Sequence, residues 1–400
     1  MDASSQKKLQ NIFRWYEPVL RARKLPIKHL KALDAIVSCG KAERGSSLYR
    51  CDAEDKEFVV NHSCRHRSCW MCSQRSRAKW IDAQQERLLS CSHFHVVFTI
   101  PQTYRVLWQY NTAWFTDTFF RIVKQTLMQL MAQKKHHGVT PGILMTLHTW
   151  GRQLSLHPHL HCVVTAGGAD PTGNWKDSGD FLLPIRVVKA LYRGLFQSAL
   201  KEAFENGEIV LPPDHERADF HRLYRRAYNQ QWSVRIEPKY PHGYGVMKYL
   251  SRYLRGGPIH PNQIVHYDPN EIRFRYLDHR DKRHKILTLK PDEFIRRLLV
   301  HVPESGQHVV RHYGLYAGAA RKRRNRCRDQ IGGATEQCSA ERPQAPLTCR
   351  CGAPLRLIGR YDAPRSKGNS LIKVSATLPV QQNDEAVIAQ AEKTSLVLRL

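Results

Sequence analysis

The segment 156–164, which reads LHPHLHCVV, constrains this chain more than any other stretch. Its polar and apolar residues alternate, and this alternation predicts a β-strand because successive side chains of a strand point to opposite faces. One face then carries His157, His159 and His161. The other face is apolar enough to sit on a hydrophobic core and carries Leu160, Cys162 and Val164.

Two histidines that lie one residue apart on a strand present their imidazoles side by side, as a divalent metal ion requires. A single histidine on a strand is usually a hydrogen-bonded residue, but three on one face favour a metal site. A hard ion such as Mg²⁺ or Mn²⁺ needs a third protein ligand and open positions for phosphate oxygens. We expect His159, His161 and, from a neighbouring strand, His148 to be the ligands, with His157 as the alternative third ligand.

The charge balance points to a polyanionic partner. The chain has 63 Lys and Arg against 35 Asp and Glu, a formal net charge of +28, and nucleic acid is the usual partner of such a protein. The sequence contains no run of about 18 apolar residues, the pattern that would predict a membrane span. Residues 1–10 also lack the apolar segment of a signal peptide. We therefore expect a cytoplasmic protein that contacts DNA and not a membrane.

Cysteines predict a zinc module near the N-terminus. Cys69 and Cys72 form a C-x2-C pair, the spacing that lets two thiolates bind one Zn²⁺. We expect the other two ligands to be Cys51 and Cys64; residues that could replace them are Cys39, His62 and His66. Arginines around these cysteines suit contacts to DNA, and they are Arg65, Arg67, Arg75 and Arg77.

Glu54 follows Cys51 at the position where a second C-x2-C pair would have its other cysteine. Zinc accepts a carboxylate ligand, although structural zinc sites seldom use one. Near the other end of the chain, Cys349 and Cys351 are too close in sequence for an ordinary zinc pair. Metal binding by these two, together with Cys327 and Cys338, is left open.

Hydrophobic periodicity predicts a mixed α and β chain. Helices are expected at 11–36, 74–89, 185–206, 244–255 and 292–302, and a long helix or a helix pair is expected at 104–134. Strands are expected at 94–100, 142–150, 156–165 and 233–237, with a hairpin at 272–276 and 285–289.

Tyr249 and Tyr253 lie four residues apart on the predicted helix at 244–255, so their phenols share one face about one turn apart. Lys248 and Arg252 lie opposite the apolar stripe of this helix, where they can contact DNA. A tyrosine hydroxyl is a nucleophile that can attack a phosphodiester and form a covalent 5′-phosphotyrosine with a free 3′-OH. A second tyrosine would permit a second strand transfer.

The His159-Leu-His161 pattern with Tyr249 and Tyr253 resembles the HUH endonucleases, whose name denotes His, a hydrophobic residue and His. The chain is similar, more narrowly, to rolling-circle insertion-sequence transposases of the insertion-sequence-ninety-one type, over roughly residues 10–320. Further matching segments, in order, are SCRHRSC at 63–69, HVVFTIP at 95–101, HTWG at 148–151, FIRR at 294–297 and RHYG at 311–314.

This resemblance implies an α+β fold, in which a palm of antiparallel strands with flanking helices follows a small Cys-rich zinc-binding module. It implies cleavage and rejoining of single-stranded DNA at element ends, metal ligands at His159 and His161, and nucleophiles at Tyr249 and Tyr253. The expected domains are a zinc module at 1–92, a nuclease domain at 93–320 and a basic, loosely ordered tail at 321–400. Such a bacterial enzyme would be associated with the nucleoid.

Two other functions would also explain the predicted DNA binding. One is a non-catalytic zinc-containing DNA-binding protein, which would not need Tyr249, His159 and His161 in one pocket. The other is a plasmid replication initiator or relaxase with the same chemistry. Initiators often carry a helicase, and the sequence has no G-x4-G-K-[ST] loop.

Overall fold

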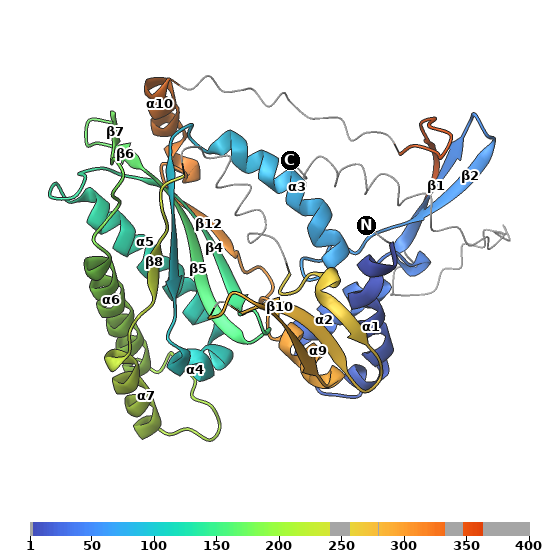
Figure 1. The fold of residues 1–400 in the computed structure, drawn as a ribbon, viewed down its shortest axis with the longest axis horizontal. Helices are drawn as coiled ribbons and strands as arrows, with labels where there is room; N and C mark the ends of the chain where they lie inside the picture. Colours follow the sequence, from blue (N-terminus) through green and yellow to red (C-terminus); the bar gives the residue numbers. More distant parts are fainter. Residues whose placement is uncertain (1–2, 241–256, 279, 333–346, 363–400) are drawn as a thin grey trace. The chain divides into compact units, whose positions relative to one another are not determined.

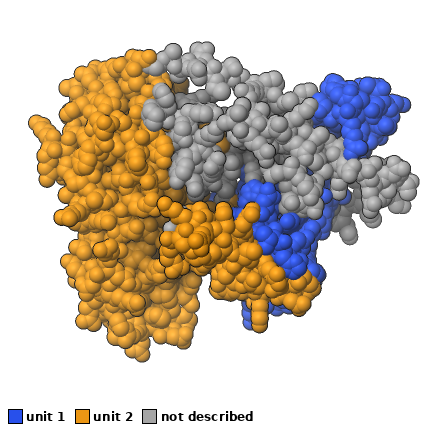
Figure 2. Space-filling view, viewed as in Figure 1, with its two compact units in different colours: residues 1–75, 260–267, 339–400 blue, residues 76–259, 268–338 orange. Residues whose placement is uncertain are grey.

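A computed structural model of the chain describes residues 3–240, 257–278, 280–332 and 347–362. The chain forms two compact units, coloured separately in Figure 2. Unit 1 comprises residues 1–75, 260–267 and 339–400, and unit 2 comprises residues 76–259 and 268–338. This division differs from the expected boundaries after residues 92 and 320. It differs because Leu88 and Leu89 pack in the core of unit 2, while a strand near residue 360 pairs within unit 1.

Unit 2 is built on a five-stranded sheet in which every neighbouring pair is antiparallel. In spatial order, its strands are β12 (Val310–Gly314), β4 (Gly142–Trp150), β5 (Leu156–Thr165), β3 (His93–Thr99) and β8 (Val234–Ile236). The expected strands β3, β4, β5 and β8 are confirmed, whereas β12 was not expected. The antiparallel sheet with flanking helices and the Cys-rich N-terminal region confirm the expected α+β class.

One face of this sheet is the hydrophobic core of unit 2. Leu160, Cys162 and Val164 of β5 are fully buried there, as their alternation predicted. Helices α5 (Thr112–Ala132) and α6 (Ile185–Glu205) cover this face, as Figure 1 shows. Apolar residues recur every three or four positions along both helices, so each helix turns a continuous apolar stripe toward the strands.

Unit 2 contains further elements outside this sheet. The expected hairpin is present as β10 (Ile272–Leu277) and β11 (His284–Leu289), and the expected long helical region is a pair because α4 (Arg105–Tyr110) ends before α5 begins. Further elements are β6 (Gly167–Ala169), β7 (Trp175–Asp177), α7 (Arg217–Asn229), α9 (Pro291–Leu299) and α10 (Arg321–Ile331). Helix α10 lies where a loosely ordered tail was expected.

Unit 1 combines two helices with a three-stranded sheet. The expected helix at 11–36 is two helices, α1 (Ala3–Arg21) and α2 (Ile27–Ser38), and Pro26 precedes the second. The sheet has the order β13 (Arg356–Asp362), β1 (Gly45–Cys51), β2 (Lys56–Asn61), and both pairs are antiparallel. Helix α3 (Trp70–Arg87) begins in this unit.

None of the helices in the described residues has an apolar stretch of the length that spanning a lipid bilayer requires.

Gly314, the last residue of β12, has backbone geometry that only glycine adopts readily. Its φ is +57°, and a Cβ atom there would overlap the carbonyl oxygen of Pro141. The chain beyond it leads to Tyr316, a fully buried ring whose hydroxyl lies 2.5 Å from Nε2 of His93. Gly314 therefore permits the close crossing that places Tyr316 in the core.

We expect Gly314→Ala to destabilise the protein by at least about 1–3 kcal/mol, the cost of a strained φ for a residue with a side chain. Urea unfolding followed by tryptophan fluorescence measures this change. The matched control is Gly318→Ala, since a Cβ atom at Gly318 would meet no atom within 4 Å. Equal stability of the two variants would contradict the prediction.

Candidate functional site

The sheet of unit 2 brings three histidines together on the face opposite the hydrophobic core. The register of β4 and β5 places His148 directly opposite His159 and Thr146 opposite His161. The ring centroid of His148 lies 5.3 Å from that of His159 and 4.6 Å from that of His161. The ring centroids of His159 and His161 are 4.8 Å apart. One ring nitrogen from each histidine lies within 4.8 Å of the other two. The cluster is therefore the size of a metal-binding site.

Neighbouring groups orient two of these rings. Nδ1 of His159 lies 2.7 Å from the carbonyl oxygen of His157, to which it donates, and this fixes the tautomer whose Nε2 carries a lone pair. Nδ1 of His161 lies 2.8 Å from Nε2 of His95, and the two rings stack with an interplanar angle of 12°. A metal-ligating histidine usually bonds through its other ring nitrogen in this manner.

His95 was not among the residues predicted for the site. It lies on β3, two residues before Val97, which is paired with His161. The signal was present in the sequence, because the expected strand at 94–100 alternates and His95 falls on the face opposite Phe94 and Val96.

The environment keeps these imidazoles neutral. Burial lowers the pKa of His159 and of His95 to about 4 each. Burial also lowers the pKa of His161 well below its ordinary value, and the proximity of His148 and His159 adds to this effect. Neutral imidazole is the form that coordinates a metal ion, so His159 and His161 are already deprotonated near neutral pH.

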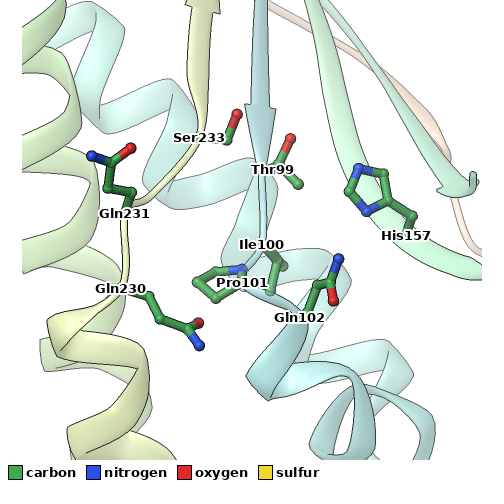
Figure 3. A pocket seen from close by; sticks show the side chains of 8 residues that line it. All are labelled: Thr99, Ile100, Pro101, Gln102, His157, Gln230, Gln231 and Ser233. Carbon is green, nitrogen blue, oxygen red and sulfur yellow. The ribbon is translucent and has the colours of Figure 1, made fainter. Parts of the chain in front are cut away.

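His157, the alternative third ligand, has a different partner. The guanidinium of Arg105 donates to its Nδ1 at 3.2 Å, and its ring lies beyond His159, 5.4 Å away between centroids. His157 instead lines a pocket at the ends of β3 and β5, shown in Figure 3. Amide and hydroxyl groups surround this pocket; its other lining residues are Thr99, Ile100, Pro101, Gln102, Gln230, Gln231 and Ser233.

Four residues predicted for the site fall outside the described residues. Tyr249 and Tyr253, the expected nucleophiles, and Lys248 and Arg252, expected to contact DNA, belong to the segment 241–256. Their relation to the histidine cluster remains a prediction from the sequence.

In unit 1, four cysteines converge where α2 ends and α3 begins. The sulfur of Cys72 lies 3.6 Å from that of Cys39 and 3.5 Å from that of Cys64, and Cys69 completes the group. Sulfurs that bind one zinc tetrahedrally at about 2.3 Å are about 3.8 Å apart. The cluster therefore has the chemistry and the size of a structural zinc site.

Backbone N–H groups point at these sulfurs. The amide of Cys64 donates to Cys39 at 3.4 Å, that of Arg65 donates to Cys72 at 3.2 Å and that of His66 donates to Cys64 at 3.4 Å. Arg65 has a φ of +54°, and this turn aims the amides inward. Such hydrogen bonds stabilise thiolates over thiols.

The structure brings together three of the four expected zinc ligands, Cys64, Cys69 and Cys72, but it places Cys39 with them instead of Cys51. Gln10 holds Cys39 in place, since its amide donates to the carbonyl oxygens of Ile36 and Cys39 at 2.9 and 2.7 Å. Cys51, at the end of β1, lies beside Cys349 and Cys351. The alternative ligand His62 is hydrogen-bonded to Ser47 at 2.9 Å.

The arginines expected to contact DNA are partly described. Arg65 and Arg67, both exposed, lie between two of the clustered cysteines. Arg75 and Arg77 lie on α3, but their side chains are outside the described residues.

Comparison with known proteins agrees with both clusters. Residues 11–100 match the family described as a transposase zinc-binding domain of the IS91 type, and residues 142–325 match a family described as putative transposase. The first match contains the four-cysteine cluster, and the second contains His148, His159 and His161. No solved structure matches the chain significantly.

Two curated relatives extend this similarity over most of the chain. A putative transposase, y4qJ, from Sinorhizobium fredii is 35% identical over 340 residues, which cover 82% of this chain and 85% of the relative. The transposase for insertion sequence element IS801 from Pseudomonas savastanoi pv. phaseolicola is 30% identical over 306 residues, covering 72% of this chain and 70% of the relative. The chain therefore belongs to the IS91-type transposases, with a zinc-binding domain near its N-terminus.

Proposed function

We propose that this transposase nicks and rejoins single-stranded DNA at the ends of an insertion sequence through a 5′-phosphotyrosine intermediate, in rolling-circle transposition. The observation that carries the proposal is the cluster of His148, His159 and His161 on one face of the sheet. Relatives named as transposases support a DNA-processing role, and the net charge of +28 favours a polyanionic substrate.

The three histidines fit a divalent ion such as Mg²⁺ or Mn²⁺ because they are close together, and because hydrogen bonds to the carbonyl oxygen of His157 and with His95 orient His159 and His161. A bound ion would polarise the scissile phosphate and stabilise the charge that develops there.

Tyr249 and Tyr253 are the proposed nucleophiles. The phenol oxygen of one bonds to phosphorus as its proton is lost, and the bond to the 3′ oxygen breaks, leaving a free 3′-OH after that oxygen takes up a proton. The phosphotyrosine preserves a phosphodiester, so a 3′-OH can reverse the step and join a new strand. Two tyrosines would allow a second strand to be cleaved while the first remains attached.

Basic residues are proposed to hold the DNA backbone. Arg65 and Arg67 beside the zinc cluster, with Arg75, Arg77, Lys248 and Arg252, would contact phosphates and thereby position the element ends and the target DNA. We expect this activity in the bacterial cytoplasm, in association with the nucleoid. A non-catalytic zinc-containing DNA-binding protein, or a replication initiator or relaxase with the same chemistry, are the alternatives.

We expect the wild-type protein to form a covalent adduct with labelled single-stranded DNA carrying its element ends, in the presence of Mg²⁺ or Mn²⁺. His161→Ala should abolish the adduct because it removes a ligand, and one or both of Tyr249→Phe and Tyr253→Phe should abolish it as well. Denaturing gel electrophoresis detects the adduct.

Tyr244→Phe, in the same segment but outside the proposed pair, is the matched control and should keep the activity. Adduct formation by a variant that lacks both Tyr249 and Tyr253 would contradict the proposed nucleophiles. Tight DNA binding by folded wild-type protein on verified ends, without any adduct, would favour the non-catalytic alternative.

His95 is proposed as a positioning residue that acts through His161. We expect His95→Ala to weaken Mn²⁺ binding by about 10–100-fold, the usual cost of losing a partner of a ligating histidine. Excess Mn²⁺ should then restore most of the cleavage rate. His95→Gln should retain more affinity, because its amide can still bond to Nδ1 of His161.

Mn²⁺ titration by calorimetry measures the change. The control is His312→Ala, since His312 lies on β12 and bonds to Gln84 at 2.6 Å. Equal Mn²⁺ affinity in His95→Ala and in the wild type would rule out this role.

The proposed ligands of the N-terminal Zn²⁺ are Cys39, Cys64, Cys69 and Cys72. Cys39→Ser and Cys64→Ser should each release one zinc ion per chain, and the double variant should release no more than either single variant, because both residues bind the same ion. Elemental analysis of purified protein measures zinc. Cys91→Ser, a buried cysteine outside the cluster, should retain the wild-type content. Full zinc retention in Cys39→Ser would refute this ligand set.

A further inference from the structure

A second group of metal-binding side chains lies in unit 1, apart from the four-cysteine cluster. The sulfurs of Cys51, Cys349 and Cys351 lie within 4.8 Å of one another, although Cys51 and Cys351 are 300 positions apart in sequence. Cys51 and Cys351 are 3.6 Å apart between sulfurs. A disulfide has its sulfurs at about 2.05 Å, so these are thiols at the spacing of ligands around one ion.

Glu54 is the candidate for a fourth ligand beside these sulfurs. Its Oε2 lies 3.6 Å from the sulfur of Cys349, and it also contacts the ammonium group of Lys56 at 3.2 Å. Glu54 follows Cys51 at the C-x2-C spacing, on the tight turn between β1 and β2, where Asp55 adopts a φ of +49°. The carboxylate therefore stands at the sequence position of the missing cysteine and lies close to Cys349, although the group with all ligand atoms within 4.8 Å contains only the three cysteines.

Strand pairing brings the two distant segments together. β13 pairs with β1 from Gly45 opposite Asp362 to Arg50 opposite Arg356. The guanidinium of Arg356 then binds the carboxylate of Asp52 through two hydrogen bonds, of 2.9 and 3.0 Å. This bidentate pair lies next to the turn that carries Glu54 and fixes how β13 is placed along β1.

The turn at residues 349–353 resembles one side of a zinc-binding hairpin. The amide of Gly352 donates to the carbonyl oxygen of Cys349 at 2.9 Å, and the amide of Cys349 donates to that of Ala353 at 2.8 Å. Gly352 has a φ of +90°, and this conformation lets the chain reverse directly after Cys351. The shorter C-x-C spacing, which argued against a zinc pair in isolation, is therefore compatible with two sulfurs that point to one centre.

Two of these three cysteines, Cys51 and Cys349, are buried, and Cys351 is exposed. Three cysteine sulfurs with a carboxylate nearby are suited to a divalent ion that binds sulfur strongly.

We propose that Cys51, Glu54, Cys349 and Cys351 form a second zinc site, which fastens residues 348–362 to the β1–β2 ribbon. The matched zinc-binding family covers residues 11–100 and thus contains neither Cys349 nor Cys351. This proposal does not depend on the DNA chemistry proposed above, because its readouts are metal content and local protection.

The test uses the full-length chain, purified under reducing conditions with saturating zinc and then freed of loosely bound metal. His148→Ala/His159→Ala/His161→Ala serves as the background, so that the histidine cluster holds no zinc. We expect two zinc ions per chain in this background. One should remain after Cys349→Ser/Cys351→Ser, and none should remain when Cys64→Ser is added. A content of one ion that Cys349→Ser/Cys351→Ser leaves unchanged would overturn the proposal.

Glu54 is tested by Co²⁺ substitution, since thiolate-to-cobalt absorption grows with the number of sulfur ligands. Glu54→Cys should increase this absorption and tighten metal binding, because it completes a four-thiolate site. Glu54→Gln should weaken binding at this site alone. Glu57→Gln, an exposed carboxylate on β2, is the matched control and should leave both the absorption and the affinity unchanged. Unchanged affinity in Glu54→Gln would remove Glu54 from the ligand set.

Hydrogen exchange of backbone amides distinguishes a local loss of structure around β13 from poor folding of the whole variant. Loss of this ion in Cys349→Ser/Cys351→Ser should increase the exchange of the β13 amides, while the amides of β4 and β5 in unit 2 stay protected. Unchanged protection of β13 after metal loss would show that strand pairing alone holds the segment, and it would contradict the fastening role.

Discussion

The pairing of β5 with β4 on one side and with β3 on the other is the constraint on which the rest of unit 2 depends. Because strand side chains alternate, the same register sends Cys162 into the core and His161 to the opposite face. A slip of one residue would bury histidines against α5 and α6 and expose the core residues. Burial of one face therefore fixes the geometry of the other, where His148 meets His159.

Much of this arrangement could be predicted from sequence, because alternation is a local property. The strand at 156–165, its histidine face and the contribution of His148 from the preceding strand all follow from a period of two and a short connection. His95 was missed because its role depends on β3 lying beside β5. The sequence of neither strand predicts which other strand it pairs with. The expected nucleophiles Tyr249 and Tyr253 rest on helical spacing and family resemblance.

The cysteines show the same limit of local reasoning. Cys64, Cys69 and Cys72 are close in sequence, so their spacing alone predicts that they can share one ion. Spacing cannot decide between Cys39 and Cys51 as the fourth ligand. Both residues precede Cys64 by a connection long enough for either sulfur to reach the other three. The hydrogen bond from Gln10 to the carbonyl oxygen of Cys39 and the pairing of β13 with β1 distinguish them, and both are contacts between distant segments.

The proximity of Cys51 to Cys351 also implies an order of events during protein synthesis. At about 5–20 residues per second, the ribosome needs roughly 15–60 s to make the 300 residues between them. Throughout that interval, β1 is an open edge that can pair with another chain, and the Cys51 thiol lacks its later neighbours. A transposase gene interrupted before codon 349 would leave this condition permanent, so even a late truncation that spares β4 and β5 would yield a product prone to aggregation.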